Sequence, residues 1–259
     1  MRSPSSKTSG EAAAARLEKA LRAAGDPVRA EGERRYLKSE LTHFGVRVPE
    51  VRRLAGRFAA EAGGRDELWA LTSGLWRRRV HECRLAAAMA LQARAELVAE
   101  PDLPRIREMV REARTWAIVD VLAVRVLGAL LVAHPGASAE LDVWAEDPDL
   151  WVRRAALLAQ IEPLQAGAPL ERFGGYADAM LAEREPFIAK AIGWVLRETG
   201  KVRPDEVYEW LLPRAGRASG VTIREAVKYL SPSQHDSILR ARPPTSHQRR
   251  TDARSAVDY

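Results

Sequence analysis

The sequence predicts an all-α fold, an α-solenoid of stacked helix pairs. Apolar residues recur at helical spacing between glycine and proline breaks, and runs of alternating polar and apolar β-branched residues are missing. Polar residues also recur at the start of similar helices with a period near 35 residues. A repeat of that length holds two helices, and each pair buries its apolar face only by stacking on its neighbours.

Helical spacing is clearest in three segments along the chain. These hold Leu17, Ala20, Leu21 and Ala24, then Leu85, Ala88, Met89 and Leu91, and then Ile192, Val195 and Leu196. Turn signals rich in glycine and proline separate the helices. They fall at residues 25–27, 63–64, 101–104, 134–136, 147–148, 167–169, 203–205 and 213–220. These breaks divide the chain into pieces with the length of helix pairs.

The repeat appears when these pieces are aligned. Each of five polar residues opens an apolar helix, and they are Arg84, Asp120, Arg154, Lys190 and Arg224, separated by 36, 34, 36 and 34 residues. Regular spacing favours a true repeat over a chance alignment of amphipathic helices. In a stack of helices these residues would form a row across one concave, basic face. Asp120 is the only acid in this row.

Length and charge bound the domain organisation. The chain has 259 residues and 46% hydrophobic content, enough for a sizeable core. We expect a disordered tail at 1–9, one domain over 10–239 and a disordered basic tail at 240–259. The formal charge of +6 lies mostly in these tails, and only +1 remains for residues 10–239. Bulk charge is therefore weak evidence for nucleic acid, and a binding surface must come from how charges are arranged.

Cysteine usage and hydropathy indicate a cytoplasmic protein. Cys83 is the single cysteine and stands among small apolar residues, which favours a buried, inert thiol. The longest apolar stretch, 116–133, carries Asp120 and Arg125, so we predict no membrane span. The polar N-terminus has no apolar segment behind it, so we predict no secretion signal.

Asp120 interrupts an apolar run and needs an explanation. An ionised carboxylate costs several kcal/mol in a dry core unless it is paired. It could cap its helix, pair with Arg154 or Arg125, or serve chemistry. Trp116 precedes Asp120 by four residues and Trp194 follows Lys190 by four, so each lies about one helical turn from its row residue. The tryptophans could equally fill the core.

Four motifs resemble a known family. RRYLKSELTHFGVRVPEVRRLA (34–55), TWAIVD (115–120), DLWVRRAALL (149–158) and FIAKAIGWVLRE (187–198) are similar to successive signatures of the AlkD family of DNA alkylation repair glycosylases. The similarity runs in order from about residue 15 to about residue 230. AIGWVLRE is the most specific of these motifs.

The resemblance implies a HEAT-like solenoid that holds duplex DNA on its concave face. Such an enzyme is a monofunctional glycosylase: it hydrolyses the N-glycosidic bond of cationic N3- or N7-alkylated purines without drawing the base into a pocket, unlike most base-flipping enzymes. By this resemblance Asp120 is the catalytic carboxylate between Trp116 and Trp194. The resemblance also implies that Arg154 contacts the DNA backbone and that Tyr36 lies in the cleft. Apart from the resemblance, we expect the cations of the row, Arg84, Arg154, Lys190 and Arg224, to meet phosphates, and Arg197 to bind DNA as well. We expect a monomer that acts at the nucleoid on alkylated double-stranded DNA.

The chain departs from the family pattern at two places. Ala117 and Ile118 stand where family members often carry an acidic or second aromatic residue, and Glu162 stands where many carry a base. The missing acid or aromatic at Ala117, together with the small charge of residues 10–239, motivates an alternative, a non-catalytic HEAT-like scaffold that binds damaged DNA or a protein. If the chain is a glycosylase, its substrate could be a methyl adduct or a bulky one.

Other chemistries find little support. His81, Glu82 and Cys83 are contiguous, but no second ligand pair follows at metal-binding spacing, and HExxH is absent. Neither GxGxxG nor GxxxxGK[ST] occurs. We therefore expect no metal and no cofactor.

Overall fold

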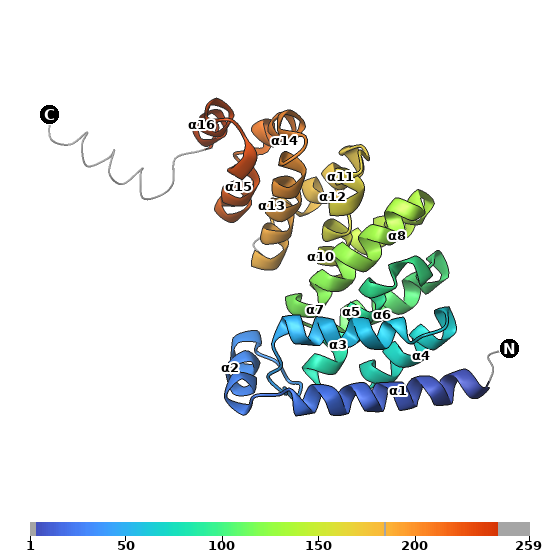
Figure 1. The fold of residues 1–259 in the computed structure, drawn as a ribbon. Coiled ribbons are helices and arrows are strands. Elements are labelled where there is room, and N and C mark those ends of the chain that lie inside the picture. Colours follow the sequence, from blue (N-terminus) through green and yellow to red (C-terminus); the bar gives the residue numbers. More distant parts are fainter. Residues whose placement is uncertain (1–3, 184, 243–259) are drawn as a thin grey trace, which may run out of the picture. The chain divides into compact units, whose positions relative to one another are not determined.

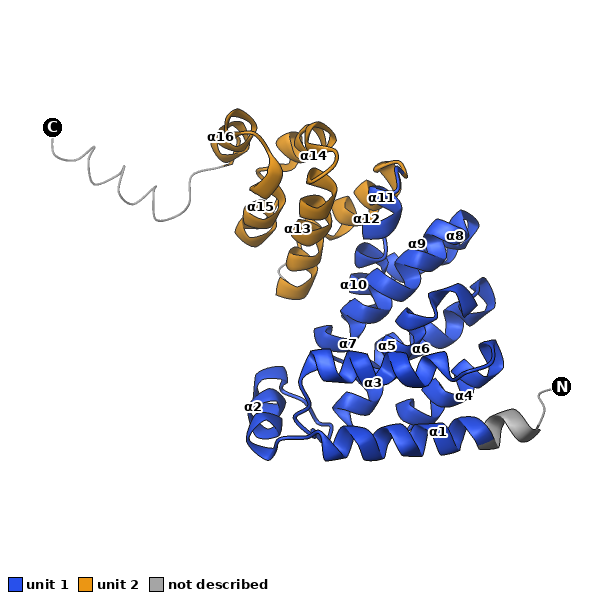
Figure 2. Ribbon diagram, in the orientation of Figure 1, with its two compact units in different colours: residues 1–167 blue, residues 168–259 orange. Residues whose placement is uncertain are grey.

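The computed structural model describes residues 4–183 and 185–242, which form helices joined by short loops (Figure 1). Within these ranges no strand occurs, and Thr42 and Val80 make an isolated bridge. The prediction of an all-α, solenoid-like fold is confirmed. The chain divides into two compact units, residues 1–167 and 168–259 (Figure 2). The boundary falls at the predicted break 167–169, where Gly167 has a φ of +98°.

The ends of the described chain differ from the predicted tails. Helix α1 begins at Pro4, so residues 4–9, which the sequence assigned to a disordered tail, are helical. Within this helix Gly10 lies directly against Ala70, where a Cβ would collide at 2.3 Å. The last helix ends at Arg240, and residues 243–259 of the predicted basic tail lie outside the described residues.

Unit 1 contains most of the helices. They are α1 (Pro4–Ala23), α2 (Pro27–Leu37), α3 (Val48–Ala60), α4 (Arg65–Trp76), α5 (His81–Ala93), α6 (Leu103–Ala113), α7 (Trp116–Asp120), α8 (Gly128–Ala133), α9 (Ser138–Ala145), α10 (Leu150–Leu158) and α11 (Ile161–Gln165). Helix α1 packs on α4, and α3 packs on α5. The core between them includes the fully buried Leu17, Leu21 and Leu71. Cys83 is buried in α5, as predicted, and burial raises the pKa of its thiol to about 12.

The apolar stretch 116–133 forms one continuous helical segment. Helix α7 passes into a π-helical segment, η3 (Val121–Leu127), and then into α8. In the described part of the chain, Trp116–Ala133 alone has the length and apolar composition to cross a membrane, and more than half of it is buried inside the protein. A core helix shows the same properties, and η3 packs against α5 and α10. A π turn widens the helix locally and is frequent at functional sites.

Helix α2 is held to unit 1 mainly through its ends and one loop. None of its residues is buried. Asp26 caps its start by accepting hydrogen bonds from the backbone of Val28 and Arg29. The loop after it approaches so closely that a Cβ on Gly45, whose φ is +75°, would lie 2.1 Å from the Asp26 carbonyl oxygen. Glu82 of α5 fixes this loop, as its carboxylate accepts hydrogen bonds from the backbone of residues 44–46.

Unit 2 contains a second set of helices. They are α12 (Glu171–Met180), α13 (Pro186–Gly200), α14 (Pro204–Leu211), α15 (Gly220–Ala226) and α16 (Pro232–Arg240). Helices α13 and α15 pack closely because Gly193 leaves no side chain between them; a Cβ there would lie 2.8 Å from the Cβ of Glu225. The Thr222 hydroxyl donates to the Ala189 carbonyl across the same contact, at 3.0 Å.

Candidate active site

Asp120 is positioned by the start of helix α7. The backbone turns at Arg114, whose φ is 49°, and the Thr115 side chain then caps the helix by accepting from the backbone of Ala117. Trp116 is the first helical residue, and Asp120 follows one turn later on the same side. The sequence signal for this start is a threonine directly before an apolar helical run. Thr115, which the sequence analysis did not select, thus fixes where the helix presents its two site residues.

Asp120 forms a two-pronged ion pair with Arg154 of α10. Arg154 Nε donates to Asp120 Oδ1 and Nη2 donates to Oδ2, each at 2.9 Å. The side chains are 16% and 6% exposed for Asp120 and Arg154. Of the partners that the sequence left open, Arg154 is therefore the observed one, and Arg125 instead pairs with Glu162 at 3.3 Å. The ion pair also confirms that these two members of the repeat row are adjacent.

Burial and the ion pair act in opposite directions on Asp120. Burial raises the pKa of its carboxyl above the ordinary value, because the charged form loses water. The hydrogen bonds from Arg154 oppose that rise and favour the anion. The paired nitrogens also fix the direction of the carboxylate, and each oxygen has a further lone pair.

An exposed aromatic pair stands one turn from Asp120. Tyr36, near the end of α2, meets Trp116 edge to face, with ring centroids 6.2 Å apart and planes at 89°. Trp116 is 37% exposed and Tyr36 is 75% exposed. Large aromatic side chains bury surface when they can, so these rings are available for contact with a ligand. Sequence spacing alone did not place Tyr36 beside Trp116.

A cavity of about 680 Å³ in unit 1 is lined by Leu37 and Thr115, which are the chain neighbours of Tyr36 and Trp116. Its walls include Lys38 after α2, Arg84 of α5, and Arg114 and Thr115 before Trp116. Lys38 and Arg114 both have a φ of 49°, so each side chain leaves a left-handed backbone turn. Acidic residues such as Glu112 also line the wall, so the cavity is mixed in charge.

Arg84, predicted to bind DNA, is largely occupied by protein contacts. Its Nη1 donates to the Glu112 carbonyl at 2.8 Å, and its guanidinium lies over the Trp76 ring at 5.0 Å. The side chain is 13% exposed, and burial lowers its pKa. Its role toward DNA stays a prediction.

Unit 2 holds the other predicted residues. Lys190 is exposed and Trp194 is half-buried, one turn apart on α13, and Arg224 is exposed on α15. Arg197 is paired with Glu225 of α15 and, at 3.2 Å, with Glu198. Two residues of the motif AIGWVLRE therefore have a structural role: Gly193 allows α15 to approach α13, and Arg197 links α13 to α15.

The departures from the family pattern have local explanations. Ile118 is fully buried, so an acidic residue there would lie in the core of unit 1. Glu162 pairs with Arg125 and lies against Gly128, which leaves no Cβ in its way. The side chains at both positions are thus accommodated by their neighbours, and the pair of Asp120 and Arg154 is unaffected.

Comparison with known proteins identifies the family. The sequence matches the DNA alkylation repair enzyme family over residues 17–230, which span both units. A search of curated proteins finds no match. The structure is similar to that of a predicted DNA alkylation repair enzyme from Enterococcus faecalis, with a TM-score of 0.72 and 21% identity over 80% of this chain and 97% of that one. It is also similar to smu.31 from Streptococcus mutans UA159, with a TM-score of 0.55 and 18% identity over 71% of this chain and 93% of that one. Because the family match covers most of the chain, this protein belongs to the DNA alkylation repair enzyme family.

Proposed function

We propose that the protein is a monofunctional DNA glycosylase that releases N3- or N7-alkylated purines from duplex DNA. One observation carries the proposal: the Asp120 carboxylate is held on both oxygens by Arg154, one helical turn from the exposed ring of Trp116. The family match supports a role in alkylation repair. The glycosylase reaction is our inference from the chemistry of this group.

The reaction needs a fixed negative charge more than it needs a strong acid. An alkylated purine that carries a positive charge is already a good leaving group. As the bond breaks, positive charge grows on the sugar, and a carboxylate near C1′ stabilises that charge or orients the attacking water. Arg154 acts as a positioning residue because it holds the carboxylate in one direction before DNA arrives.

Aromatic rings can add to this stabilisation. The face of a tryptophan attracts a cation, with about 0.5–2 kcal/mol depending on desolvation. Trp116 is exposed beside Asp120, and Tyr36 supports its ring at a right angle. The role of Trp194, which lies in unit 2, as a second such ring stays a prediction. Each ring favours the transition state because the charge on the sugar is largest there.

Release of free base from alkylated DNA tests the proposal. Purified protein incubated with methylated duplex DNA should liberate 7-methylguanine or 3-methyladenine, detected by mass spectrometry. The abasic product should stay uncut until alkali is added, because no lysine is proposed as a nucleophile. Strand cleavage without alkali would contradict a monofunctional enzyme. Comparing a methyl adduct with a bulky N7 adduct in the same assay defines the substrate size.

A binding function without catalysis is the second candidate. It is favoured by the ion pair itself, because a carboxylate with both oxygens bonded to a buried arginine can be purely structural. Tight binding to abasic or nicked DNA with no base release would establish this function. Binding that is insensitive to salt would instead indicate a protein partner.

Lys190 and Arg224 should contribute to DNA affinity through phosphate contacts. Both side chains are exposed in unit 2. Lys190→Ala and Arg224→Ala should each lower the slope of log affinity against log salt by about 0.9 if one phosphate contact is lost. Fluorescence anisotropy with a DNA duplex at several salt concentrations measures the slope. Lys19→Ala, which removes an exposed lysine of α1 outside the row, is the matched control and should leave the slope unchanged.

A further inference from the structure

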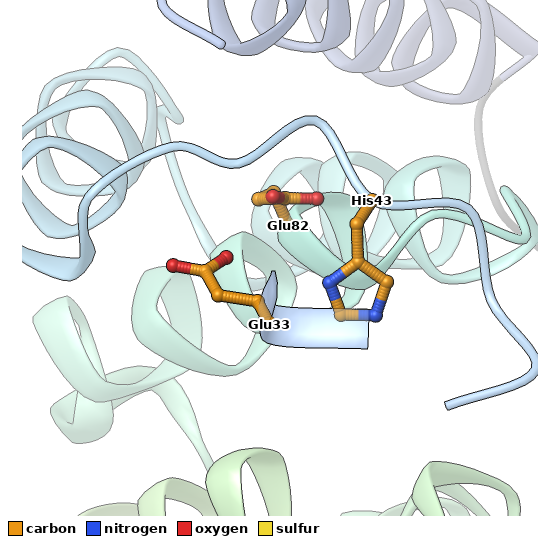
Figure 3. A group of neighbouring side chains, drawn as sticks. All are labelled: Glu33, His43 and Glu82. Atoms are coloured by element: carbon orange, nitrogen blue, oxygen red, sulfur yellow. The ribbon is translucent and has the colours of Figure 1, made fainter. Parts of the chain in front are cut away.

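Three potential metal ligands meet at the attachment point of helix α2. They are Glu33 of α2, His43 of the following loop and Glu82 of α5, and Figure 3 shows their side chains together. One ligand atom from each lies within 4.8 Å of the other two. Glu33 and Glu82 are separated by more than forty residues in the sequence, so only the fold brings these groups together.

The His43 imidazole is notable for its two ring nitrogens. Both of its ring nitrogens are buried, and neither has a hydrogen-bond partner among the described residues. Its ring stacks on His81, with centroids 4.5 Å apart and planes at 7°, and His81 Nδ1 is also buried without a partner. His81 is only 5% exposed. Buried polar atoms are nearly always bonded, so three orphan nitrogens at one place indicate a missing ligand.

The two carboxylates retain capacity for a cation. Glu82 Oε1 accepts two backbone hydrogen bonds, but Oε2 accepts one, from Phe44 at 2.9 Å, and keeps a second lone pair. Glu33 has a long contact of 3.4 Å with Arg29. Burial raises the pKa of the Glu33 carboxyl, against the opposing effect of Arg29, and burial also lowers the pKa of the His43 imidazole.

We propose that Glu33, His43 and Glu82 bind a divalent transition metal ion of the Zn²⁺ class. Imidazole nitrogen selects such ions over Mg²⁺ and Ca²⁺, and carboxylates complete their shell. Bonds of about 2.0–2.2 Å place tetrahedral ligands about 3.4 Å apart. The ligand atoms lie within 4.8 Å of one another, so each pair would have to approach by about an ångström. Rotation of the half-buried Glu33 and His43 side chains would bring them to this separation.

The metal would clamp α2 to α5. Helix α2 has no buried residue of its own, so a bond from Glu33 to an ion on Glu82 joins it directly to the core of unit 1. Tyr36 lies one turn after Glu33 and contacts Trp116. The ion thus fixes the position of an aromatic residue in the candidate active site. The metal site itself does not depend on the proposed glycosylase function.

Calorimetry with Zn²⁺ on the untagged, chelator-treated full chain tests this inference without DNA. The wild type should bind one ion per chain. His43→Gln and Glu33→Gln should each weaken binding by about a hundredfold or more. His134→Gln removes an exposed histidine elsewhere in unit 1 and should leave the affinity unchanged. Glu33 lies on an exposed helix, so its variant should fold even if the His43 variant does not.

Hydrogen exchange distinguishes a clamp from adventitious binding. Zn²⁺ should slow the exchange of amides in residues 27–46 of the wild type and have no such effect in Glu33→Gln. Equal Zn²⁺ affinity in the wild type and both site variants would overturn the proposal, as would the absence of binding in the wild type. Binding lost in His134→Gln instead would place the ion elsewhere. A failure of base release in the glycosylase assay would leave these outcomes unaffected.

Discussion

Asp120→Asn is expected to slow base release by about a hundred- to a thousandfold. Asparagine keeps the shape of the side chain and can still accept a hydrogen bond from Arg154 through its single oxygen. It carries no negative charge, so it cannot stabilise the cationic sugar in the transition state. Single-turnover release of 7-methylguanine from saturated enzyme measures the chemical step apart from DNA binding.

Matched measurements separate chemistry from folding in this variant. Asp66→Asn makes the same change at an exposed position in the first turn of α4 and should release base at the wild-type rate. Urea unfolding shows whether Asp120→Asn is folded under assay conditions, since Arg154 then lacks its charged partner. A folded Asp120→Asn with the wild-type rate of release would mean that Asp120 serves only the ion pair.

The sequence predicted part of the site because equivalent positions of successive repeats lie next to each other in a stack of helix pairs. Asp120 and Arg154 are 34 residues apart, and the repeat register placed them side by side, where the structure shows their ion pair. The register did not show how each helix is rotated about its axis. For that reason the choice between Arg154 and Arg125 as the partner of Asp120 stayed open until the structure resolved it.

Other features of the site depend on contacts that periodicity does not encode. Arg84 and Arg197 appear in the sequence as cations on helices, yet each meets an acidic residue of a neighbouring helix, Glu112 and Glu225. The contact of Tyr36 with Trp116 likewise depends on where α2 is attached. Such tertiary partners are decided by packing between helices, so no single helix pattern reveals them.

The fold was more predictable than the site because the signals for a helix lie within its own segment of sequence. Apolar spacing and glycine or proline breaks indicated the helices, and the break at 167–169 coincides with the boundary between the units. The loop between α2 and α3 has no period, so its attachment to Glu82 was not foreseen. In the sequence Glu82 stands beside His81 and Cys83, and nothing there indicates that Glu33 and His43 lie close to it. The sequence therefore predicted no metal.

Replacing Glu82 should have the largest effect on stability. Its buried carboxylate accepts hydrogen bonds from three backbone nitrogens, those of Phe44, Gly45 and Val46. Each unsatisfied buried donor costs about 1–3 kcal/mol, so Glu82→Ala, which leaves three of them, should lower the free energy of unfolding by at least about 3 kcal/mol. Urea unfolding in EDTA measures this loss without any contribution from a metal ion.

Two further variants test the reason for this loss. Glu82→Gln keeps one carbonyl oxygen for Gly45 and Val46, so it should fall between the wild type and Glu82→Ala. Glu31→Ala removes an exposed glutamate of α2 that pairs with Arg34 on the surface, and it should change stability by less than about 0.5 kcal/mol. If Glu82→Ala were as stable as Glu31→Ala, the loop would be held by its other contacts, Gly45 against α2 above all, and the carboxylate would be free to serve the metal alone.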